Sequence, residues 1–283
     1  MYNLSSPSTI KELLERSEFS FKKSLGQNFL INPDVCPQMA EDAVTENDMG
    51  VLEIGPGIGV LTAELSKVAK KVVAIELDER LGAVLAETLK DYNNIELVFG
   101  DAMKLDLNKI ISEKFQGMNV CVCANLPYYI TSPLIMMLLE SRLPVESITV
   151  MVQKEAALRI CAPIGDRKAG AVSVAVQYYS VPQLLFHVPS SSFMPAPKVD
   201  SAVIKLQVRK APEIDIKSEK DFFKLVKAGF SQRRKTLVNS VSSMLSIDKS
   251  RIAEALRACG INEDVRIEKL TMQQLAQLTN ELW

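Results

Sequence analysis

The sequence predicts an α/β fold, with a doubly wound and mostly parallel sheet followed by a small all-helical C-terminal domain. In the first half of the chain, short apolar runs alternate with amphipathic helical patterns, which is the rhythm of βαβ units. From Glu219 onward only helical patterns remain. A proline-containing linker follows Val208, so we expect one domain over residues 1–208 and a second over residues 209–283.

The composition is typical of an ordinary globular protein. The chain has 283 residues, enough for about two domains, and is 47% hydrophobic and 24% charged. Its longest apolar runs, such as Leu134–Leu139, are far shorter than the roughly 20 residues that span a bilayer. Neither a secretory segment nor a membrane partner is therefore expected, and the protein is predicted to be cytoplasmic. With one histidine and no Cys-x-x-Cys pair, no metal site is expected.

Five strands are expected in the first half of the chain, each a nearly continuous apolar run of the kind found in a sheet covered on both faces. They are Val51–Ile54, Val72–Glu76, Ile95–Phe99, Val120–Asn125 and Ile148–Val152. The helical patterns between them include Val60–Val68, Asp78–Leu89 and Pro133–Leu139.

Two further strands, Leu184–Val188 and Ala202–Val208, flank a turn rich in proline and serine. They could close the sheet as an antiparallel edge. In the C-terminal part, helices are expected over residues 219–245, 248–258 and 271–281. Ser250 and Thr271 are the candidate N-caps of the last two.

A glycine-rich loop, Glu-Ile-Gly-Pro-Gly-Ile-Gly at 53–59, lies between the first strand and the first of these helices. Glycine allows a tight turn and leaves room for a ligand to approach the backbone. The next strand ends at Glu76, about 20 residues on, where a carboxylate can bind both hydroxyls of a ribose. A tight turn beside a solvated acid is the alternative. The combination of strand, loop, helix and acid favours a nucleoside cofactor.

The loop favours S-adenosylmethionine over a dinucleotide. It lacks the third glycine of the Gly-x-Gly-x-x-Gly pattern, and Pro56 removes one amide donor for a phosphate. Glu53 would repel a phosphate but suits a cofactor that carries a sulfonium. These features argue against an NAD-dependent oxidoreductase. Asp101, after the third strand, can accept a hydrogen bond from an adenine amino group, although an aspartate in a turn is also common.

The fourth strand ends in Asn125-Leu126-Pro127-Tyr128, a pattern suited to holding an adenine amine. That amine is a weak nucleophile because its lone pair is delocalised into the ring, so it needs acceptors that orient it rather than a strong base. The Asn125 side-chain oxygen and the Leu126 carbonyl can supply them. Pro127 restricts the backbone before it, and Tyr128 offers a stacking face worth ~1–3 kcal/mol per base. A turn with an aromatic plug is the alternative explanation.

Seven segments of the chain resemble the rRNA adenine-N6,N6-dimethyltransferase family, in its bacterial 16S rRNA dimethyladenosine transferase branch. The resemblance runs nearly from end to end. The segments are FKKSLGQNFL at 21–30, EIGPGIGVLT at 53–62, AIELD at 74–78, GDAMKLDL at 100–107, NLPYYITSP at 125–133, FMPAPKVDSAV at 193–203 and FSQRRKTL at 230–237.

The resemblance implies a Rossmann-like class I S-adenosylmethionine-dependent methyltransferase sheet and a set of site residues. Gly55 would touch the methionine portion, Glu76 the ribose and Asp101 the adenine of the cofactor. The target adenine would be flipped out of its stack and held between Tyr128 and Phe193. The implied catalytic residues are Asn125, Leu126, Pro127, Tyr128 and Phe193. The implied cofactor contacts are Gln27, Asn28, Leu30, Glu53, Gly55, Gly57, Glu76, Leu77, Asp101, Ala102 and Asn125.

The implied substrate is a pair of adjacent adenosines in the 3′-terminal hairpin of 16S rRNA, methylated within the assembling 30S subunit by a monomeric enzyme. Two positions depart from the family pattern. Tyr129 stands where many members have asparagine, and Ala169 stands where an aromatic residue is expected. Residues 162–165 also differ, so these departures leave the shape of the RNA approach open.

Basic residues concentrate in the second part of the chain. Residues 1–208 carry 19 basic and 24 acidic residues, whereas residues 209–283 carry 14 and 10. Phe222–Asn239 is predicted to form one amphipathic helix with an exposed basic face. A solvated charged face is the usual explanation of such a run, but here RNA phosphate contacts are favoured. The expected contacts are Lys224, Lys227, Arg233, Arg234 and Lys235.

Two alternatives remain for the function. An Erm-type 23S rRNA methyltransferase is closely related, but that group typically has Asn-Ile-Pro-Tyr where this chain has Asn-Leu-Pro-Tyr. A non-catalytic ribosome-assembly factor would bind the precursor particle without transferring a methyl group.

Overall fold

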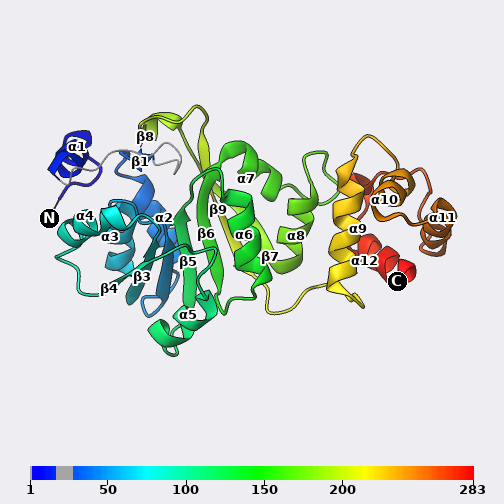
Figure 1. Cartoon of the computed structure of the whole chain (residues 1–283), viewed down its shortest axis with the longest axis horizontal. Coiled ribbons are helices and arrows are strands. Elements are labelled where there is room, and N and C mark those ends of the chain that lie inside the picture. The colour runs from blue at the N-terminus through cyan, green and yellow to red at the C-terminus, as the bar shows by residue number, and fades with distance from the viewer. Residues whose placement is uncertain (1, 17–27) are drawn as a thin grey trace. The chain divides into compact units, whose positions relative to one another are not determined.

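The computed structural model describes residues 2–16 and 28–283, and its contacts divide the chain into two compact units (Figure 1). The first unit consists of Met1–Ala157 and Pro182–Val208, and the second of Leu158–Val181 and Arg209–Trp283. The second unit therefore contains a segment from the middle of the chain in addition to the C-terminal residues. The division into domains at residues 1–208 and 209–283 stays a prediction.

Within the described residues, a seven-stranded sheet forms the centre of the α/β part, in the order β4-β3-β2-β5-β6-β9-β7. Neighbouring strands from β4 to β6 pair in parallel, and β9 pairs with β6 in antiparallel orientation, as the sequence suggested. The strand order reverses between β2 and β5, and ligands of open α/β sheets bind at such a switch point. The strands are β2 Gly50–Ile54, β3 Lys71–Glu76, β4 Ile95–Phe99, β5 Val120–Asn125, β6 Ser147–Gln153, β7 Ser180–Val188 and β9 Ser201–Val208.

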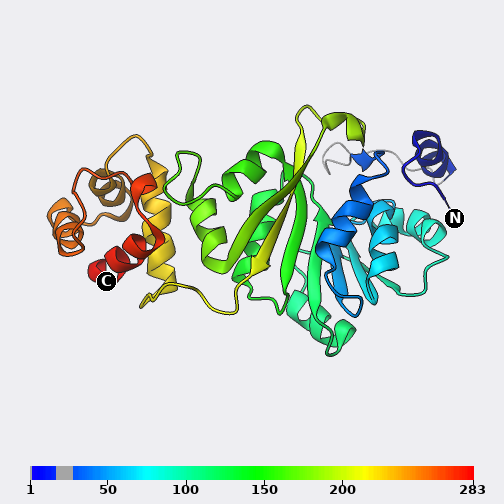
Figure 2. The ribbon, with the colours of Figure 1, turned by 180° about the vertical axis from the view of Figure 1, so that it is seen from behind.

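Helices cover both faces of the sheet, which confirms the α/β architecture. The helix α6 lies on the face turned towards the viewer in Figure 1, and α2 on the face seen in Figure 2. The prediction for Val60–Val68 is confirmed, whereas Asp78–Leu89 is divided into a 3-10 turn, η2, and the helix α4. The elements are α1 Pro7–Arg16, α2 Val35–Ala43, α3 Val60–Val68, η2 Glu79–Leu81, α4 Gly82–Thr88, α5 Leu107–Phe115, α6 Thr131–Glu140 and α7 Lys154–Ile160.

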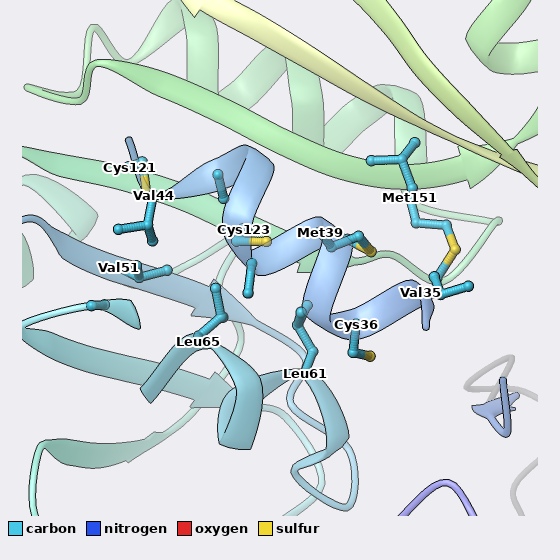
Figure 3. Close-up of a cluster of buried hydrophobic side chains, with 14 of the residues drawn as sticks. Val35, Cys36, Met39, Val44, Val51, Leu61, Leu65, Cys121, Cys123 and Met151 are labelled. Atoms are coloured by element: carbon cyan, nitrogen blue, oxygen red, sulfur yellow. The ribbon is translucent and has the colours of Figure 1, made fainter. Parts of the chain in front are cut away.

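A buried apolar cluster holds α2 against α3, β5 and β6 (Figure 3). Met39 of α2 is fully buried and lies near Leu61 and Leu65 of α3. Cys121 and Cys123 are fully buried in β5, as expected for small core side chains. This cluster fixes the strands whose ends form the site described below.

A short two-stranded pairing lies beyond the main sheet. The strand β1, Phe29–Leu30, pairs in antiparallel orientation with β8, Phe193–Met194, and Leu30 is opposite Phe193. The Ile31 amide also donates to the Ser192 carbonyl at 2.8 Å. This pairing brings the N-terminal segment beside the turn rich in proline and serine.

In the second unit, the prediction of one helix over residues 219–245 is wrong. The helix α9 ends at Ser231, and α10 begins only after Thr236, whose side chain accepts from the Asn239 amide as its N-cap. Phe222–Asn239 is therefore not one amphipathic helix. Thr271 is confirmed as an N-cap, but the N-cap position of α11 is Asp248 rather than Ser250. The helices are α8 Ala171–Tyr179, α9 Glu219–Ser231, α10 Leu237–Leu245, α11 Lys249–Ala258 and α12 Met272–Leu282.

An aromatic cluster joins α8 to α9. The Tyr178 ring lies 5.5 Å from that of Phe222 and 5.3 Å from that of Phe223, measured between ring centroids. The hydroxyls of Tyr178 and Tyr179 both donate to the Glu219 carboxylate. The mid-chain helix α8 thus belongs to the core of the second unit.

No described helix has the combination of length and apolar character needed to cross a membrane.

Gly229 in α9 is expected to tolerate no larger side chain. An added Cβ would lie 2.1 Å from the Ile267 Cδ1 atom and 2.9 Å from the Leu237 Cδ1 atom. Overpacking of this kind costs about 1–3 kcal/mol, so Gly229→Ala should lower the melting temperature of the second unit. Its only tryptophan, Trp283, provides a fluorescence signal for that unit.

The matched control is Gly170→Ala, at a position with extended backbone where an added Cβ meets nothing within 4 Å. Equal melting temperatures for the two variants would contradict the proposed close contact at Gly229.

Candidate functional site

A cleft opens at the carboxyl ends of β2, β3 and β5, at the switch point of the sheet. The cleft lies within the first unit, and nearly all the predicted catalytic and cofactor-binding residues line it. Gln27 lies outside the described residues. The predicted residues that line the cleft are Asn28, Leu30, Glu53, Gly55, Gly57, Glu76, Leu77, Asp101, Ala102, Asn125, Leu126, Pro127, Tyr128 and Phe193.

The glycine loop has left-handed backbone at Gly55, Gly57 and Gly59, with φ values of 75°, 61° and 88°. The glycines serve different purposes. A Cβ on Gly59 would lie 2.9 Å from the Leu89 Cδ2 atom, so this glycine allows the start of α3 to pack closely. A Cβ on Gly55 would meet nothing within 4 Å, and Gly55 lines the cleft. The open side of Gly55 is where a ligand can approach the backbone.

Glu53, at the end of β2, is a buried carboxyl group with only 1% of its surface exposed. Its Oε2 atom has no hydrogen-bond partner among the residues that the structure describes. Burial raises the pKa of Glu53 to about 8, and the negative charge of Glu76 adds to the increase in pKa against the effect of the Thr62 hydroxyl. A buried acid with an unused oxygen beside an open cleft is suited to a cationic ligand.

Glu76, at the end of β3, connects the glycine loop to the neighbouring turn. The Gly57 amide donates to its Oε2 atom at 3.1 Å, and the Asp78 amide donates to its Oε1 atom at 2.8 Å. Burial raises the pKa of Glu76, while these backbone hydrogen bonds oppose the increase. Each carboxylate oxygen has two lone pairs, so both can still accept bonds from ribose hydroxyls.

Asp101 follows β4 and has a role in its own turn. Its Oδ1 atom accepts from the Met103 amide at 3.0 Å, and its Oδ2 atom lies 3.3 Å from the Lys104 Nζ atom. The turn explanation for this residue therefore holds, although Asp101 also lines the cleft. The apolar side chains of Leu77 and Met103 are exposed beside it, and they offer faces for a purine. Met103 was missed by the sequence reasoning, because a methionine after a turn has no distinctive spacing.

The Asn-Leu-Pro-Tyr segment turns from β5 towards α6. The Leu126 amide donates to the Met151 carbonyl at 3.2 Å, and the Pro127 carbonyl accepts from the Ile130 amide at 3.2 Å. Within the described part of the chain, neither the Asn125 side-chain amide nor the Leu126 carbonyl forms a hydrogen bond. Two acceptors are thus available at the cleft.

Aromatic residues from different elements border the same cleft. Tyr128 is half-buried, and its hydroxyl lies 2.7 Å from the Ser201 Oγ atom of β9, which fixes the ring. Burial raises the pKa of Tyr128, so the hydroxyl is neutral. Phe193 of β8 is buried but lines the cleft, and Tyr129 is 56% exposed at the cleft. The exposed ring of Tyr129 was noted only as a departure from the family pattern.

The predicted RNA contacts all lie in the second unit and differ in their surroundings. Lys224 forms an ion pair with Asp221 at 2.8 Å. Lys227, Arg234 and Lys235 are exposed. Arg233 differs from them, because its guanidinium donates to two backbone carbonyls of another segment.

The cleft fits S-adenosylmethionine. Glu53 offers an unused buried oxygen to a cation, Glu76 offers carboxylate oxygens to a ribose, and the open side of Gly55 leaves space that a Cβ would occupy. Two carboxyl groups beside the glycine loop disfavour a phosphate. The strand order and this cleft define the protein as a class I S-adenosylmethionine-dependent methyltransferase.

The chain belongs to the ribosomal RNA adenine dimethylase family, whose model matches residues 18–283. This match confirms the resemblance noted in the sequence. A ribosomal RNA small subunit methyltransferase A from Alkaliphilus metalliredigens (strain QYMF) is 46% identical over 283 residues, covering 100% of this chain and 99% of the relative. A protein of the same name from Alkaliphilus oremlandii (strain OhILAs) is 47% identical over 284 residues, covering 100% and 99%.

Solved structures agree with this assignment. A dimethyladenosine transferase from Plasmodium falciparum superposes with a TM-score of 0.73 at 28% identity, covering 88% of this chain and 95% of that one. The 23S rRNA methyltransferase ErmE superposes with a TM-score of 0.69 at 27% identity, covering 90% and 99%.

Replacing Glu53 by glutamine should stabilise the protein without cofactor at neutral pH. In the unfolded chain Glu53 ionises above its ordinary pKa of 4.5, but in the folded protein it keeps its proton up to a pKa of about 8. The folded state therefore binds the extra proton, and stability falls as pH rises from about 4.5 to 8. Glu53→Gln removes this loss, which is about 3 kcal/mol at pH 7.

The measurement is the melting temperature at pH 4.5 and pH 7.5, with Glu46→Gln, an exposed carboxyl, as the control. The gain of Glu53→Gln should appear at pH 7.5 and nearly vanish at pH 4.5. A gain of equal size at both values would contradict the raised pKa.

The glycine loop provides a test that separates packing from ligand binding. Gly59→Ala forces a Cβ against Leu89, so it should lower the melting temperature more than Gly55→Ala does. Both substitutions carry the strain of left-handed backbone, about 1–2 kcal/mol. Gly55→Ala adds a methyl group on the side of the cleft, so it should weaken cofactor binding more than Gly59→Ala does.

Calorimetric titration with S-adenosylmethionine and thermal melting of the same two variants check the expectation. If both variants lose stability and affinity in the same proportion, the assignment of separate purposes to the two glycines is wrong.

Proposed function

We propose that this methyltransferase dimethylates N6 of two adjacent adenosines in the 3′-terminal hairpin loop of 16S rRNA, within the assembling 30S subunit. The observation that carries the proposal is a pair of acceptors at the same cleft as the buried acids, the Asn125 side-chain oxygen and the Leu126 carbonyl, which have no hydrogen-bond partner among the described residues. The curated relatives named ribosomal RNA small subunit methyltransferase A support the choice of subunit.

Three acidic residues line the cofactor-binding half of the cleft. Glu53 and Glu76 are buried, and Asp101 is partly exposed. Glu76 would accept from the ribose hydroxyls and Asp101 from the adenine amino group, and Glu53 would interact with the positively charged sulfur. Asn28 and Leu30, from the N-terminal segment, cover this half of the cleft from the side of β1. When bound, S-adenosylmethionine supplies an activated methyl group on a positively charged sulfur.

Asn125 and Leu126 orient the adenine amine. Their two oxygens accept hydrogen bonds from the two N–H groups of N6. These hydrogen bonds orient the nitrogen so that its lone pair points away from the ring and towards the methyl group. Tyr128 and Phe193 hold the flipped base by stacking, with ~1–3 kcal/mol available per base. Positioning and a polar lining are sufficient for an in-line transfer. The proton leaves to solvent once the nitrogen has become positively charged.

The same arrangement accounts for two transfers to one nitrogen. A monomethylated N6 keeps one N–H bond, so one of the two acceptors is enough to orient it for the second transfer. A strong base at this position would be no advantage, because the amine is neutral before attack.

We further propose that the enzyme acts as a cytoplasmic monomer and that cations of the second unit bind rRNA phosphates. Lys224, Lys227, Arg234 and Lys235 supply positive charge on exposed side chains.

An Erm-type 23S rRNA methyltransferase is the nearest alternative, since ErmE shares the fold. The sequence favours the small subunit, because identity is 46–47% with the small-subunit relatives and 27% with ErmE. A non-catalytic assembly factor would have no use for the free acceptors beside a cofactor cleft.

The proposal is tested with labelled S-adenosylmethionine and unmethylated 30S and 50S particles. Label should enter the 30S particles only, and mass spectrometry should locate dimethyladenosine at two adjacent positions of the 3′-terminal hairpin. Label in 50S particles would favour the Erm-type alternative, and no label in either would favour the assembly factor.

Asn125→Ala should abolish most methyl transfer while binding of the 30S particle persists. Loss of one oriented polar group in an active site typically lowers kcat by about 10²–10³. The control is Asn108→Ala, an exposed asparagine of the same unit, which should keep full activity. Single-turnover transfer to 30S particles is the measurement. An unchanged kcat for Asn125→Ala would remove this residue from the mechanism.

A further inference from the structure

The loop between α7 and α8, residues 161–170, is attached to the rest of the second unit at three places. The Gln177 side chain donates to the Ala162 carbonyl at 2.8 Å, and the Gly170 amide donates to the Ser173 hydroxyl at 2.9 Å. Both of these attachments come from α8. The third comes from Arg233, which is 64 and 66 residues away in sequence.

Arg233 holds the charged end of the loop. Its Nη2 atom donates to the Arg167 carbonyl at 2.6 Å and to the Ala169 carbonyl at 2.8 Å. Both N–H bonds of that nitrogen are therefore used by the protein itself. Ala169, which accepts one of these hydrogen bonds, is buried, whereas Arg233 is exposed overall. The contact depends on the length of the arginine side chain, because the Nη2 atom lies one bond further from the backbone than a lysine Nζ atom would.

Four exposed cations lie next to these hydrogen bonds in sequence. Arg167 and Lys168 belong to the loop, and Arg234 and Lys235 follow Arg233 directly. Across the residues that the structure describes, none of the four forms an ion pair. The acid within the loop, Asp166, is occupied by accepting from the Lys168 amide at 2.6 Å. We call these four residues the composite basic patch.

We propose that Arg233 is a positioning residue that assembles the composite basic patch, and that this patch binds phosphates of the substrate rRNA. Arg233 itself is then not one of the phosphate contacts predicted from the sequence. The inference rests on the proposed function, since it assumes an rRNA substrate. It adds two RNA contacts, Arg167 and Lys168, from a segment outside the C-terminal basic run.

The physical reason is geometric. Two cations on a loop that moves freely bind phosphates with an entropy loss, whereas cations held in one place do not incur that loss on binding. Arg233 fixes the loop through its backbone, so the side chains of Arg167 and Lys168 stay free for RNA. A lysine at position 233 has a side chain that is one bond shorter, so its ammonium group would not reach both carbonyls from the same backbone position.

The experiment is a double-mutant cycle on methylation of unmethylated 30S particles. Arg233→Ala and the pair Arg167→Ala/Lys168→Ala should each raise KM for the particles by about tenfold, with kcat and cofactor affinity unchanged. In the Arg167→Ala/Lys168→Ala background, Arg233→Ala should add less than about twofold, because the groups that it positions are already absent. Arg234→Ala should keep its full effect in that background.

Conservative variants and salt dependence separate positioning from direct contact. Arg233→Lys should behave like Arg233→Ala, whereas Arg234→Lys should remain close to the parent protein. The Arg167→Ala/Lys168→Ala pair should lower the slope of log KM against log salt by about 0.7–0.9 for each phosphate contact that is lost. Arg257→Ala, an exposed arginine paired with Glu263, is the control and should change none of these values.

Three results would overturn the inference: equal effects of Arg233→Ala in both backgrounds, normal KM for Arg233→Lys, or normal KM for the Arg167→Ala/Lys168→Ala pair. The loop pair and Arg233→Lys keep the test decisive even if Arg233→Ala fails to fold. If the unsubstituted protein neither binds nor methylates 30S particles, the proposed function itself is wrong. This outcome is measured without any of the variants, so it is distinguishable from a failure of the inference.

Discussion

The active site depends on one carboxylate, Glu76, which accepts hydrogen bonds from the Gly57 amide and the Asp78 amide. Through these bonds the end of β3 fixes the glycine loop that follows β2, and therefore the distance between the first two strands at the cleft. Burial raises the pKa of this group, and the two backbone donors oppose that increase. The same carboxylate thus holds the loop in place and offers acceptor oxygens to a ribose. A substitution of Glu76 would therefore affect both the loop conformation and ribose binding.

The strands of the sheet and most of the cleft could be predicted from the sequence because each has a local signal. Parallel strands such as Val120–Asn125 are apolar throughout, and the residues at their carboxyl ends meet at one edge of the sheet. The end of α9 at Ser231 had no such signal, since residues 232–236 keep the polarity of a helix surface. Met103 and the short β1–β8 pairing also escaped prediction, because both depend on contacts distant in sequence.

Arg233 illustrates why a basic run cannot be read as a set of equivalent contacts. In sequence it is one of three adjacent cations, and net charge alone treats them alike. In the structure its guanidinium is committed to the carbonyls of Arg167 and Ala169, while Arg234 and Lys235 are exposed without such partners among the described residues. A cationic side chain that holds the backbone and one that is available to a ligand differ in their hydrogen bonds. The amino-acid composition does not show this difference.

Glu53 also suits the cleft to a methyl donor that carries a positive charge. Glu53 has a free oxygen and a pKa near 8, so it can ionise when a cation comes close and return to its neutral form when the cation is gone. A ligand without that positive charge would be attracted less strongly by Glu53. Burial of Glu53 therefore reduces the stability of the empty protein at neutral pH, but it leaves an acceptor that would favour a cationic ligand.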